Sequence, residues 1–363
     1  MCAMGGDQVE EAMAGAVSAL RPAVGRDWRV RASGLEWDCL HTAAHLAGGL
    51  ARYAGQLAAR RTDRYVPFEV SFREDSGPAD VLDVLDTMGR LFALTLRATP
   101  RGTRAAHPYP AGGSDPAGFA AMGVTEIVLH THDLATGLGV PYEPPAALCE
   151  AALTHLFPEA RPGHPPWPTL LWATGRGELP DRPRTGHWRW RNPLVIPGER
   201  IELRELTVAA ATDLHLGGDG GFDWVADGPF EGTRGASGML RRKYEDGTLR
   251  PGWEVYAIVR REDGRALGGI GFHGAPDEQG RAEVGYDLAP SARNQGYATE
   301  ALSTLGAWAF TQPGLRILHA VIDPANTASQ QVVTRAGFLP LTDGPHPTPT
   351  EDGTPMLVYG FMG

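Results

Sequence analysis

A short loop in the second half of the chain has the composition of a phosphate-binding turn. Residues 283–288 (EVGYDL) alternate as a strand does, and residues 293–298 (RNQGYA) then lead into an amphipathic helix. A pyrophosphate needs several backbone N–H groups that converge on it, and a helix N-terminus supplies them with a favourable dipole. Gly296 lets the backbone approach closely, and Arg293 adds a positive charge. The spacing alone is equally compatible with a plain strand-to-helix connection.

Two histidines and a glutamate in the first half have the chemistry of metal ligands. Glu126 and His130 are four residues apart in TEIVLHTHDLA and share one face of a predicted helix, while WDCLHTAAHL places His45 on another helix. A carboxylate and two imidazoles leave open coordination positions, as a catalytic Zn²⁺ or similar divalent ion requires. His41 and His132 are further candidates, although His132 lies roughly opposite to His130. Spacing alone favours caps or exposed ion pairs.

Helical periodicity dominates the chain up to about residue 195. Apolar residues recur every three or four positions, and Gly/Pro-rich loops separate the periodic stretches. Four amphipathic helices with such loops predict an all-α bundle. The predicted helices are Trp37–Arg61, Ala79–Thr95, Gly118–Gly137 and Pro145–Phe157.

Strand patterns replace the helical pattern after residue 195. Strands alternate with helices that begin near Gly296 and span Thr327–Arg335, which predicts an α/β domain with helices on both faces of a mixed sheet. RWRNPLVIPGER (189–200) is the predicted linker, and we expect two domains, residues 1–193 and 198–363. The predicted strands are IELRELTV (201–208), EVYAIVRRE (254–262), ALGGIGFHG (266–274), RAEVGYDL (281–288), RILHAVID (316–323) and MLVYGF (356–361).

Composition excludes several classes of protein. The formal net charge of −10 argues against a general nucleic-acid binder, and no apolar run approaches the ~20 residues that span a bilayer. The N-terminus lacks the basic start of a secretory signal, so we expect a cytoplasmic protein. Cys2, Cys39 and Cys149 are far apart, which predicts neither a disulfide framework nor a cysteine zinc site. Cys39 and Cys149 lie in apolar helical surroundings and are expected to be buried.

The second half resembles the GNAT superfamily of acetyltransferases. The pattern R-x-x-G-x-A after E-V-G-Y is similar to the acetyl-CoA pyrophosphate loop, and DPANTASQQVVTRAGF (323–338) is similar to the N-x-x-S…GF segment of the same superfamily. The resemblance covers about residues 201–363. It is greatest to the branch that acetylates ribosomal-protein N-termini, together with relatives that act on small amines. It implies a mixed, mostly antiparallel sheet and acetyl transfer from acetyl-CoA to a primary amine of a small molecule or a protein N-terminus.

The resemblance also implies roles for individual residues. The loop 293–298 should cradle the pyrophosphate, and the strand 283–288 should diverge from residues 316–323 and hydrogen-bond the pantetheine arm. Asn326 should hydrogen-bond the cofactor, and Ser329 should protonate or hydrogen-bond the departing thiolate. The implied cofactor-binding residues are Val284, Tyr286, Leu288, Arg293, Asn294, Gln295, Gly296, Tyr297, Ala298, Thr299, Asn326 and Ser329.

Direct attack of an amine on the thioester needs a base for the ammonium proton. Glu283, which begins the central strand, is the first candidate, acting through a water, and His273 is the second; Asp287 shares the face of Glu283. Many GNAT enzymes carry a tyrosine acid four residues before the glycine of GF, but this chain has Val333 there. Ser329 or solvent then takes that role.

The acceptor should be held by the variable, glycine-rich segment Asp213–Gly252. Its acidic residues could pair with a cationic amine or simply be solvated, and its aromatic residues could line an apolar slot or belong to the core. The residues concerned are Asp223, Asp227, Glu231, Trp224 and Phe230.

The first half resembles the DinB-like four-helix domain of the mycothiol-dependent maleylpyruvate isomerase N-terminal family. The resemblance rests on WDCLHTAAHL, GVTEIVLHTHDLATGLG and LLWATGRGELPDRP, and covers roughly residues 5–192. In that family a divalent, zinc-like metal is held at the positions of His45, Glu126 and His130. A low-molecular-weight thiol is an implied partner, although these residues do not identify one. Arg176 is placed either to bind a carboxylate or to cap a helix end.

Three hypotheses follow for the whole chain. The first is a two-domain acetyltransferase in which the helical half tunes the substrate or adds a thiol-dependent step. The second is a metal- and thiol-dependent isomerase or transferase whose GNAT half is secondary. The third makes the helical half a scaffold or sensor for the acetyltransferase.

Overall fold

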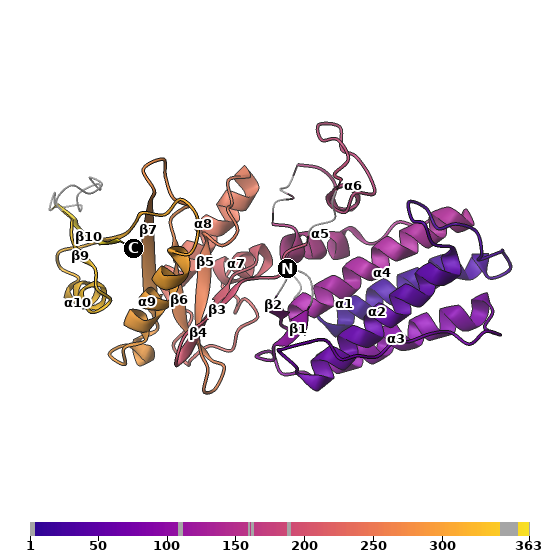
Figure 1. The fold of residues 1–363 in the computed structure, drawn as a ribbon, viewed down its shortest axis with the longest axis horizontal. Coiled ribbons are helices and arrows are strands. Elements are labelled where there is room, and N and C mark those ends of the chain that lie inside the picture. Colours follow the sequence, from indigo (N-terminus) through magenta and orange to yellow (C-terminus); the bar gives the residue numbers. More distant parts are fainter. Residues whose placement is uncertain are drawn as a thin grey trace. The chain divides into compact units, whose positions relative to one another are not determined.

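The computed structural model describes residues 4–107, 112–158, 160, 163–186, 190–341 and 355–362, and the chain divides into two compact units, Met1–Asn192 and Pro193–Gly363 (Figure 1). The N-terminal unit is helical, and the C-terminal unit is built on a sheet. The predicted fold class, an all-α bundle followed by an α/β domain with a mixed sheet, is confirmed. No helix among the described residues is long and apolar enough to cross a membrane.

Four helices pack side by side in the N-terminal unit, because α1 and α2 each contact both α3 and α4. Two further helices extend from α4, since α5 packs on α4 and α6 on α5. A short antiparallel hairpin, β1–β2, connects α3 to α4. The elements are α1 (Gly6–Leu20), η1 (Arg21–Ala23), α2 (Cys39–Ala59), α3 (Pro78–Ala98), β1 (Ala105–His107), β2 (Gly112–Ser114), α4 (Pro116–Leu138), α5 (Ala146–Leu156) and α6 (Pro166–Ala173).

The predicted set of bundle helices was wrong in one member. The first bundle helix is α1, which the sequence did not reveal, whereas the predicted helix Pro145–Phe157 forms α5 outside the four-helix core. The buried residues of α1, among them Val9, Ala12, Ala16 and Leu20, recur every three or four positions as in the other bundle helices, although two of these four are small. Cys39 and Cys149 are buried and unbonded as expected, and Cys2 lies outside the described residues.

Local signals explain the bounds of the two helices that carry the predicted metal ligands. Asp38 caps α2 by accepting a hydrogen bond from the His41 amide, and Asp115 caps α4 by accepting one from the Gly118 amide. Gly139 ends α4 in the left-handed conformation, which glycine adopts without steric cost. Buried residues lie on almost every side of α4, so this helix occupies the middle of the N-terminal unit.

The described part of the C-terminal unit contains an eight-stranded sheet in the order β3-β4-β5-β6-β7-β8-β10-β9. Every neighbouring pair is antiparallel except β7 and β8, which are parallel. The strands are β3 (Val195–Pro197), β4 (Ile201–Glu205), β5 (Val255–Arg260), β6 (Ala266–Phe272), β7 (Arg281–Leu288), β8 (Ile317–Ile322), β9 (Leu339–Pro340) and β10 (Leu357–Met362).

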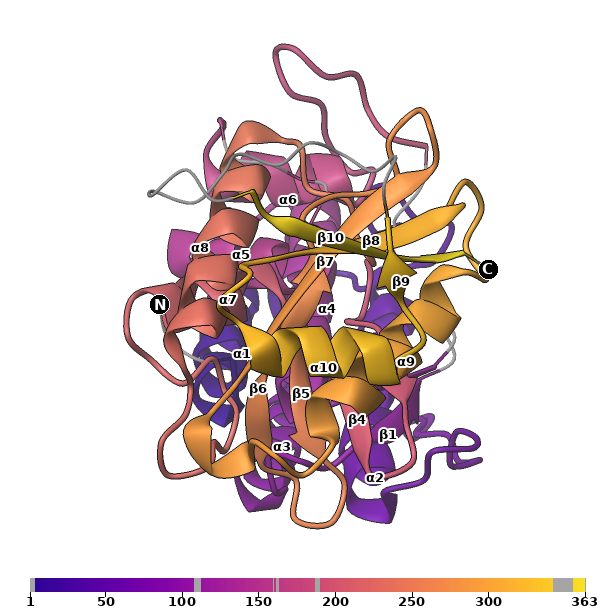
Figure 2. The same ribbon diagram turned by 90° about the vertical axis from the view of Figure 1, so that its left-hand side faces the viewer.

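Helices cover both faces of this sheet, because side chains alternate along each strand. In β5, Val255, Ala257 and Val259 pack against α7 and α8, while Tyr256 and Ile258 belong to the core that α9 completes. On the face seen in Figure 2, α9 packs on β3, β4 and β7, and α10 packs on α9 and β8. The helices are α7 (Val208–His215), α8 (Glu231–Asp246), η2 (Pro290–Ala292), α9 (Tyr297–Ala309) and α10 (Thr327–Arg335).

Two boundary predictions in this unit were wrong. The predicted strand 201–208 ends at Glu205, because the Thr207 side chain accepts from the Ala210 amide and begins α7. The predicted linker 189–200 contains β3, which pairs with β4 through a tight turn at Gly198. In both segments a short strand ends directly before a capping or turn residue. Hydrophobic periodicity alone does not locate such an end.

Candidate functional site

The parallel strands β7 and β8 pair only at their beginnings. Their ladder joins Arg281 to Ile317, Ala282 to Leu318 and Glu283 to His319. Beyond Glu283, β7 continues to Leu288 with β6 as its partner, whereas β8 continues beside β10. The two strands therefore diverge, and the β8-side edge of β7 from residue 284 onward offers backbone groups to an extended ligand.

The loop 293–298 stands between the end of β7 and α9. Gly296 caps α9 in the left-handed conformation with φ of 81°, and Asn294 also has a positive φ of 59°. The amides of residues 295–299 have no hydrogen-bond acceptor among the described residues. A backbone of this shape, with amides open at a helix N-terminus, matches what a phosphate group requires.

Arginine side chains brace this loop from two sides. Arg200 donates to the carbonyl of Gln295 at 3.0 Å and pairs with Glu300 at 2.9 Å. Arg293 donates to the carbonyl of Leu288 at 3.1 Å, and its guanidinium lies 4.8 Å above the ring centroid of Phe230. The loop conformation is thus fixed by the protein itself.

Residues from α10 and β7 meet beside the diverging strands. Asn326 caps α10 by accepting from the Ser329 amide at 3.0 Å. The Tyr286 hydroxyl donates to the backbone carbonyl of Ser329 at 3.2 Å, and burial raises the pKa of Tyr286 to about 12. Val333, at the position where many GNAT enzymes have tyrosine, is fully buried in the core. The sequence analysis named Tyr286 as a cofactor-binding residue but did not predict that its hydroxyl meets Ser329, because this contact depends on how α10 packs.

Glu283 lies between two histidines. Its Oε1 is 2.9 Å from Nδ1 of His273, and its Oε2 is 3.8 Å from Nε2 of His319. The contact with His273 lowers the pKa of Glu283 below its usual range, although burial acts in the opposite direction. Burial lowers the pKa of His319. The two base candidates from the sequence are thus in direct contact, with an ionised carboxylate beside the imidazole.

The second acidic residue of this face, Asp287, has a structural role. Asp287 accepts hydrogen bonds from the amide and hydroxyl of Thr233 and from the Gly269 amide, at 2.9, 2.5 and 3.1 Å. These bonds fix the N-terminal turn of α8 on the sheet. Asp227 is engaged in the same way, because it accepts from the amide and hydroxyl of Ser291.

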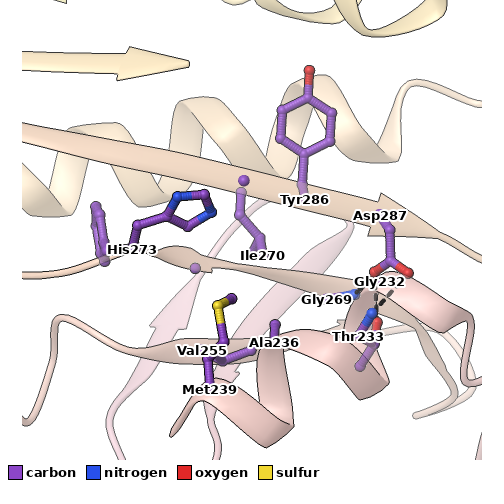
Figure 3. Close-up of a pocket in the computed structure, with 13 residues that line it drawn as sticks. Gly232, Thr233, Ala236, Met239, Val255, Gly269, Ile270, His273, Tyr286 and Asp287 are labelled. Carbon is purple, nitrogen blue, oxygen red and sulfur yellow. Dashed lines mark hydrogen bonds between the residues drawn. The ribbon is translucent and has the colours of Figure 1, made fainter. Parts of the chain in front are cut away.

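A pocket lies between α8 and the strands β6 and β7 (Figure 3). Its volume is about 150 Å³, and His273, Tyr286 and Asp287 are among the residues that line it. Part of the acceptor segment predicted from the sequence, α8, forms one wall. Trp224 and Phe230 do not line this pocket.

In the N-terminal unit, the structure brings His45, Glu126 and His130 together. One ligand atom from each residue lies within 4.8 Å of the others, and theirs is the only such group among the described residues. The shared Oε2 of Glu126 is 3.0 Å from Nε2 of His130 and 4.0 Å from Nε2 of His45. Ligand atoms about 2.1 Å from a common ion lie about 3–4 Å apart, so small side-chain adjustments suffice to coordinate one. The donor set fits a divalent metal.

A second layer of polar residues holds His130. Its Nδ1 is 3.2 Å from Asp133, which in turn accepts from Arg176 at 3.0 and 2.7 Å. Burial alone lowers the pKa of His130, but the contacts with Asp133 and Glu126 more than offset it and raise that pKa to about 9. Arg176 therefore binds a carboxylate of its own unit, and Asp133 is a residue that the sequence analysis did not single out.

The other histidines near this trio lie outside it. His41 is exposed and pairs with Asp38 at 3.0 Å, and His132 stacks edge-on against Trp167 with ring centroids 5.4 Å apart. Trp37 covers His45, with ring centroids 5.0 Å apart.

Comparisons with known families agree with both halves. The model of the acetyltransferase (GNAT) domain family matches residues 200–339, and that of the mycothiol maleylpyruvate isomerase N-terminal domain matches residues 7–135. Each covers less than half of the chain.

Similar individual proteins match the second half. An uncharacterised N-acetyltransferase of Bacillus subtilis, YjdG, is 33% identical over 88 residues, which are 24% of this chain and 52% of that protein. The uncharacterised N-acetyltransferase p20 of Bacillus licheniformis is 31% identical over 30% of this chain and 61% of its own length. The chain thus spans between half and two thirds of these relatives.

Solved structures align with the same region. An acetyltransferase from Agrobacterium tumefaciens is 26% identical, with 47% of this chain and 95% of that chain covered and a TM-score of 0.34. A GNAT-family acetyltransferase from Bacillus anthracis is 18% identical, with 47% and 98% covered and a TM-score of 0.32.

Proposed function

We propose that this chain, in which a GNAT acetyltransferase domain follows a mycothiol maleylpyruvate isomerase N-terminal domain, transfers an acetyl group from acetyl-CoA to a primary amine. The observation that carries the proposal is the divergence of β7 from β8 directly before a helix N-terminus with open amides. An extended arm fits the first feature and a pyrophosphate fits the second.

The cofactor contacts follow from this placement. The edge of β7 at Val284, Tyr286 and Leu288 hydrogen-bonds the pantetheine amides, and the loop from Arg293 to Thr299 binds the pyrophosphate. The side chain of Asn326, whose Oδ1 already caps α10, contributes its NH₂ group.

The transfer forms one N–C bond and breaks the C–S bond of the thioester. The amine nitrogen attacks the acetyl carbon, and the proton it loses passes to the Glu283–His273 pair, directly or through a water. Glu283 holds Nδ1 of His273, so the other ring nitrogen faces the pocket that His273 lines. Both sequence candidates then act as a unit, with the carboxylate stabilising the imidazolium.

The departing thiolate receives a proton or a hydrogen bond from α10. Ser329 supplies the hydroxyl that the resemblance implies. The Tyr286 hydroxyl, whose pKa burial raises to about 12, is protonated at neutral pH and donates its one proton to the Ser329 backbone carbonyl, which holds α10 beside β7.

For the N-terminal unit we propose metal binding by His45, Glu126 and His130. The convergence of these three side chains within 4.8 Å supports it. A divalent ion there would act as a Lewis acid with open coordination positions. We assign this unit neither an isomerase reaction nor a thiol substrate.

The test of acetyl transfer uses the full chain, acetyl-CoA and a panel of primary amines, with release of the CoA thiol as the readout. We expect His273→Ala and Glu283→Gln to lower kcat/KM by roughly 10²-fold or more, and Ser329→Ala with Tyr286→Phe to lower kcat further than either alone. Glu278→Gln, an exposed glutamate in the turn before β7, is the matched control and should retain full activity. Unchanged turnover in the His273 and Glu283 variants contradicts the assigned base.

A further inference from the structure

The pocket between α8 and the sheet has the dimensions of a small apolar binding site. Its volume is about 150 Å³, and the apolar side chains of Ala236 and Met239 from α8 face Val255 of β5 across it (Figure 3). An apolar cavity of about 150 Å³ accommodates a benzene ring in another protein. A branched aliphatic group or one aromatic ring therefore fits this pocket.

Glycines on two neighbouring strands create the space. Gly269 and Gly271 of β6 and Gly285 of β7 line the pocket, and Gly271 is the direct cross-strand partner of Gly285. Packing explains the first two, because a Cβ at Gly271 would lie 2.5 Å from the carbonyl oxygen of Glu254, and one at Gly269 would lie 2.8 Å from the Thr233 hydroxyl.

No packing contact of this kind explains the glycine at position 285. Within the described part of the chain, a Cβ there would approach only Nε2 of His273, at 3.2 Å. A strand interior loses stability with glycine, and such a residue often marks the close approach of a ligand. Gly285 thus keeps the space directly in front of His273 open.

The pocket offers no unengaged carboxylate to a cation. Asp287 is the acidic residue among its lining, and its two oxygens accept three hydrogen bonds from Thr233 and Gly269. Glu283 is in contact with His273 and does not line the pocket. A positively charged substituent would therefore be desolvated here without a partner.

We propose that the acceptor is a primary amine whose α-carbon carries a compact apolar substituent, with the substituent in this pocket and the amine nitrogen beside His273. The inference rests on the proposed acetyl transfer and specifies its substrate class. A free aliphatic amine carries this arrangement of an amine beside an apolar substituent. The first residue of a polypeptide carries it too when its side chain is small and apolar.

The experiment compares kcat/KM of the full chain for glycinamide, leucinamide and lysinamide, measured by release of the CoA thiol. Each buried methylene raises kcat/KM about fourfold. The kcat/KM for leucinamide should therefore exceed that for glycinamide by tenfold or more, whereas the kcat/KM for lysinamide should not. The tetrapeptide Leu-Gly-Gly-Gly then distinguishes the sources. A rate above that of leucinamide assigns a polypeptide N-terminus, and a lower rate assigns a free amine.

Two variants on α8 test the pocket itself. Ala236→Leu adds a side chain inside it, whereas Gly235→Leu adds the same side chain where a Cβ meets nothing within 4 Å. We expect Ala236→Leu to lower kcat/KM for leucinamide at least tenfold and to leave glycinamide within about twofold. Gly235→Leu should change neither substrate.

The outcomes separate this inference from the proposed function. Acetylation of glycinamide without preference for leucinamide, a preference for lysinamide, or an equal loss of both substrates in Ala236→Leu overturns the pocket assignment and leaves acetyl transfer standing. Absence of transfer to every amine overturns both.

Discussion

Each unit of this protein places one glutamate between two histidines, and the two trios differ in what surrounds them. In the N-terminal trio, the side chains of Glu126 and His130 are 13% and 5% exposed, and both histidines approach the same carboxylate oxygen. In the C-terminal trio, His273 and Glu283 are 50% and 30% exposed, and the histidines approach different oxygens of Glu283.

We infer from this difference that the surroundings of such a cluster, and not residue type alone, decide its chemistry. Convergence on one point, with Asp133 and Arg176 behind it, prepares the N-terminal trio to surround an ion. The open arrangement on diverging strands leaves a ring nitrogen of His273 toward a pocket, which suits proton transfer. The following predictions test this contrast, beginning with the largest effect.

The same substitution in the two trios should have opposite consequences. Glu126→Gln removes the anionic ligand and should reduce retained metal from about one ion per chain to almost none, as measured by elemental analysis after chelator-free purification. Glu283→Gln should leave the metal content unchanged while acetyl transfer falls. Loss of metal from the Glu283 variant, or its retention in the Glu126 variant, contradicts the contrast.

Disruption of the loop at α9 should abolish only the C-terminal activity. Gly296→Glu strains a residue with φ of 81° and puts a negative charge at the loop proposed to bind the pyrophosphate, so we expect acetyl-CoA to bind about 100-fold more weakly in calorimetry. Gly314→Glu carries the same strain and charge at φ of 94°, with nothing within 4 Å of its Cβ, and should bind normally. Equal weakening in both would mean that the loop is not the binding site.

Removal of the support behind His130 should weaken the metal site without eliminating it. Asp133→Asn takes away the carboxylate that orients the ring, and loss of such a partner typically costs 10–100-fold in metal affinity. A competition titration with a chromophoric chelator measures the change. Asp86→Asn, on the exposed face of α3 beside Arg90, is the control. Unaltered affinity in the Asp133 variant would show that the ligands are oriented by other contacts.

The smallest expected effect is on the pH dependence of stability. The folded-state pKa of Glu283 is lowered chiefly by His273, so its contribution to stability is complete above about pH 4.3 and is lost as pH falls through the folded-state value. Glu283→Gln should therefore reduce the drop in Tm between pH 6 and pH 3.5 by about one or two degrees. Glu278→Gln should show the same decrease in Tm with falling pH as the wild-type protein. An identical decrease in the wild-type protein and in both variants would contradict the link between the pKa of Glu283 and stability.

Local patterns were sufficient for most of the elements that carry function. The strand 281–288 and the helix Thr327–Arg335 have the predicted bounds, and α9 begins directly after the glycine that the loop pattern identified. These elements have strong alternation or clear caps, which depend on neighbouring residues only. The helix α1 has helical spacing of its buried residues but no side-chain cap at its N-terminus, and it was not predicted.

The sequence by itself determined the two domain types, the loop proposed to bind phosphate and the identities of the candidate ligands, because those depend on residue type at fixed spacing. Tertiary structure alone decided that Arg176 holds Asp133 behind His130, that the Tyr286 hydroxyl meets the Ser329 carbonyl, and that Gly285 opens a pocket in front of His273. Each of these contacts joins segments that are far apart along the chain or lie on different elements. Such contacts are set by packing, which no local pattern encodes.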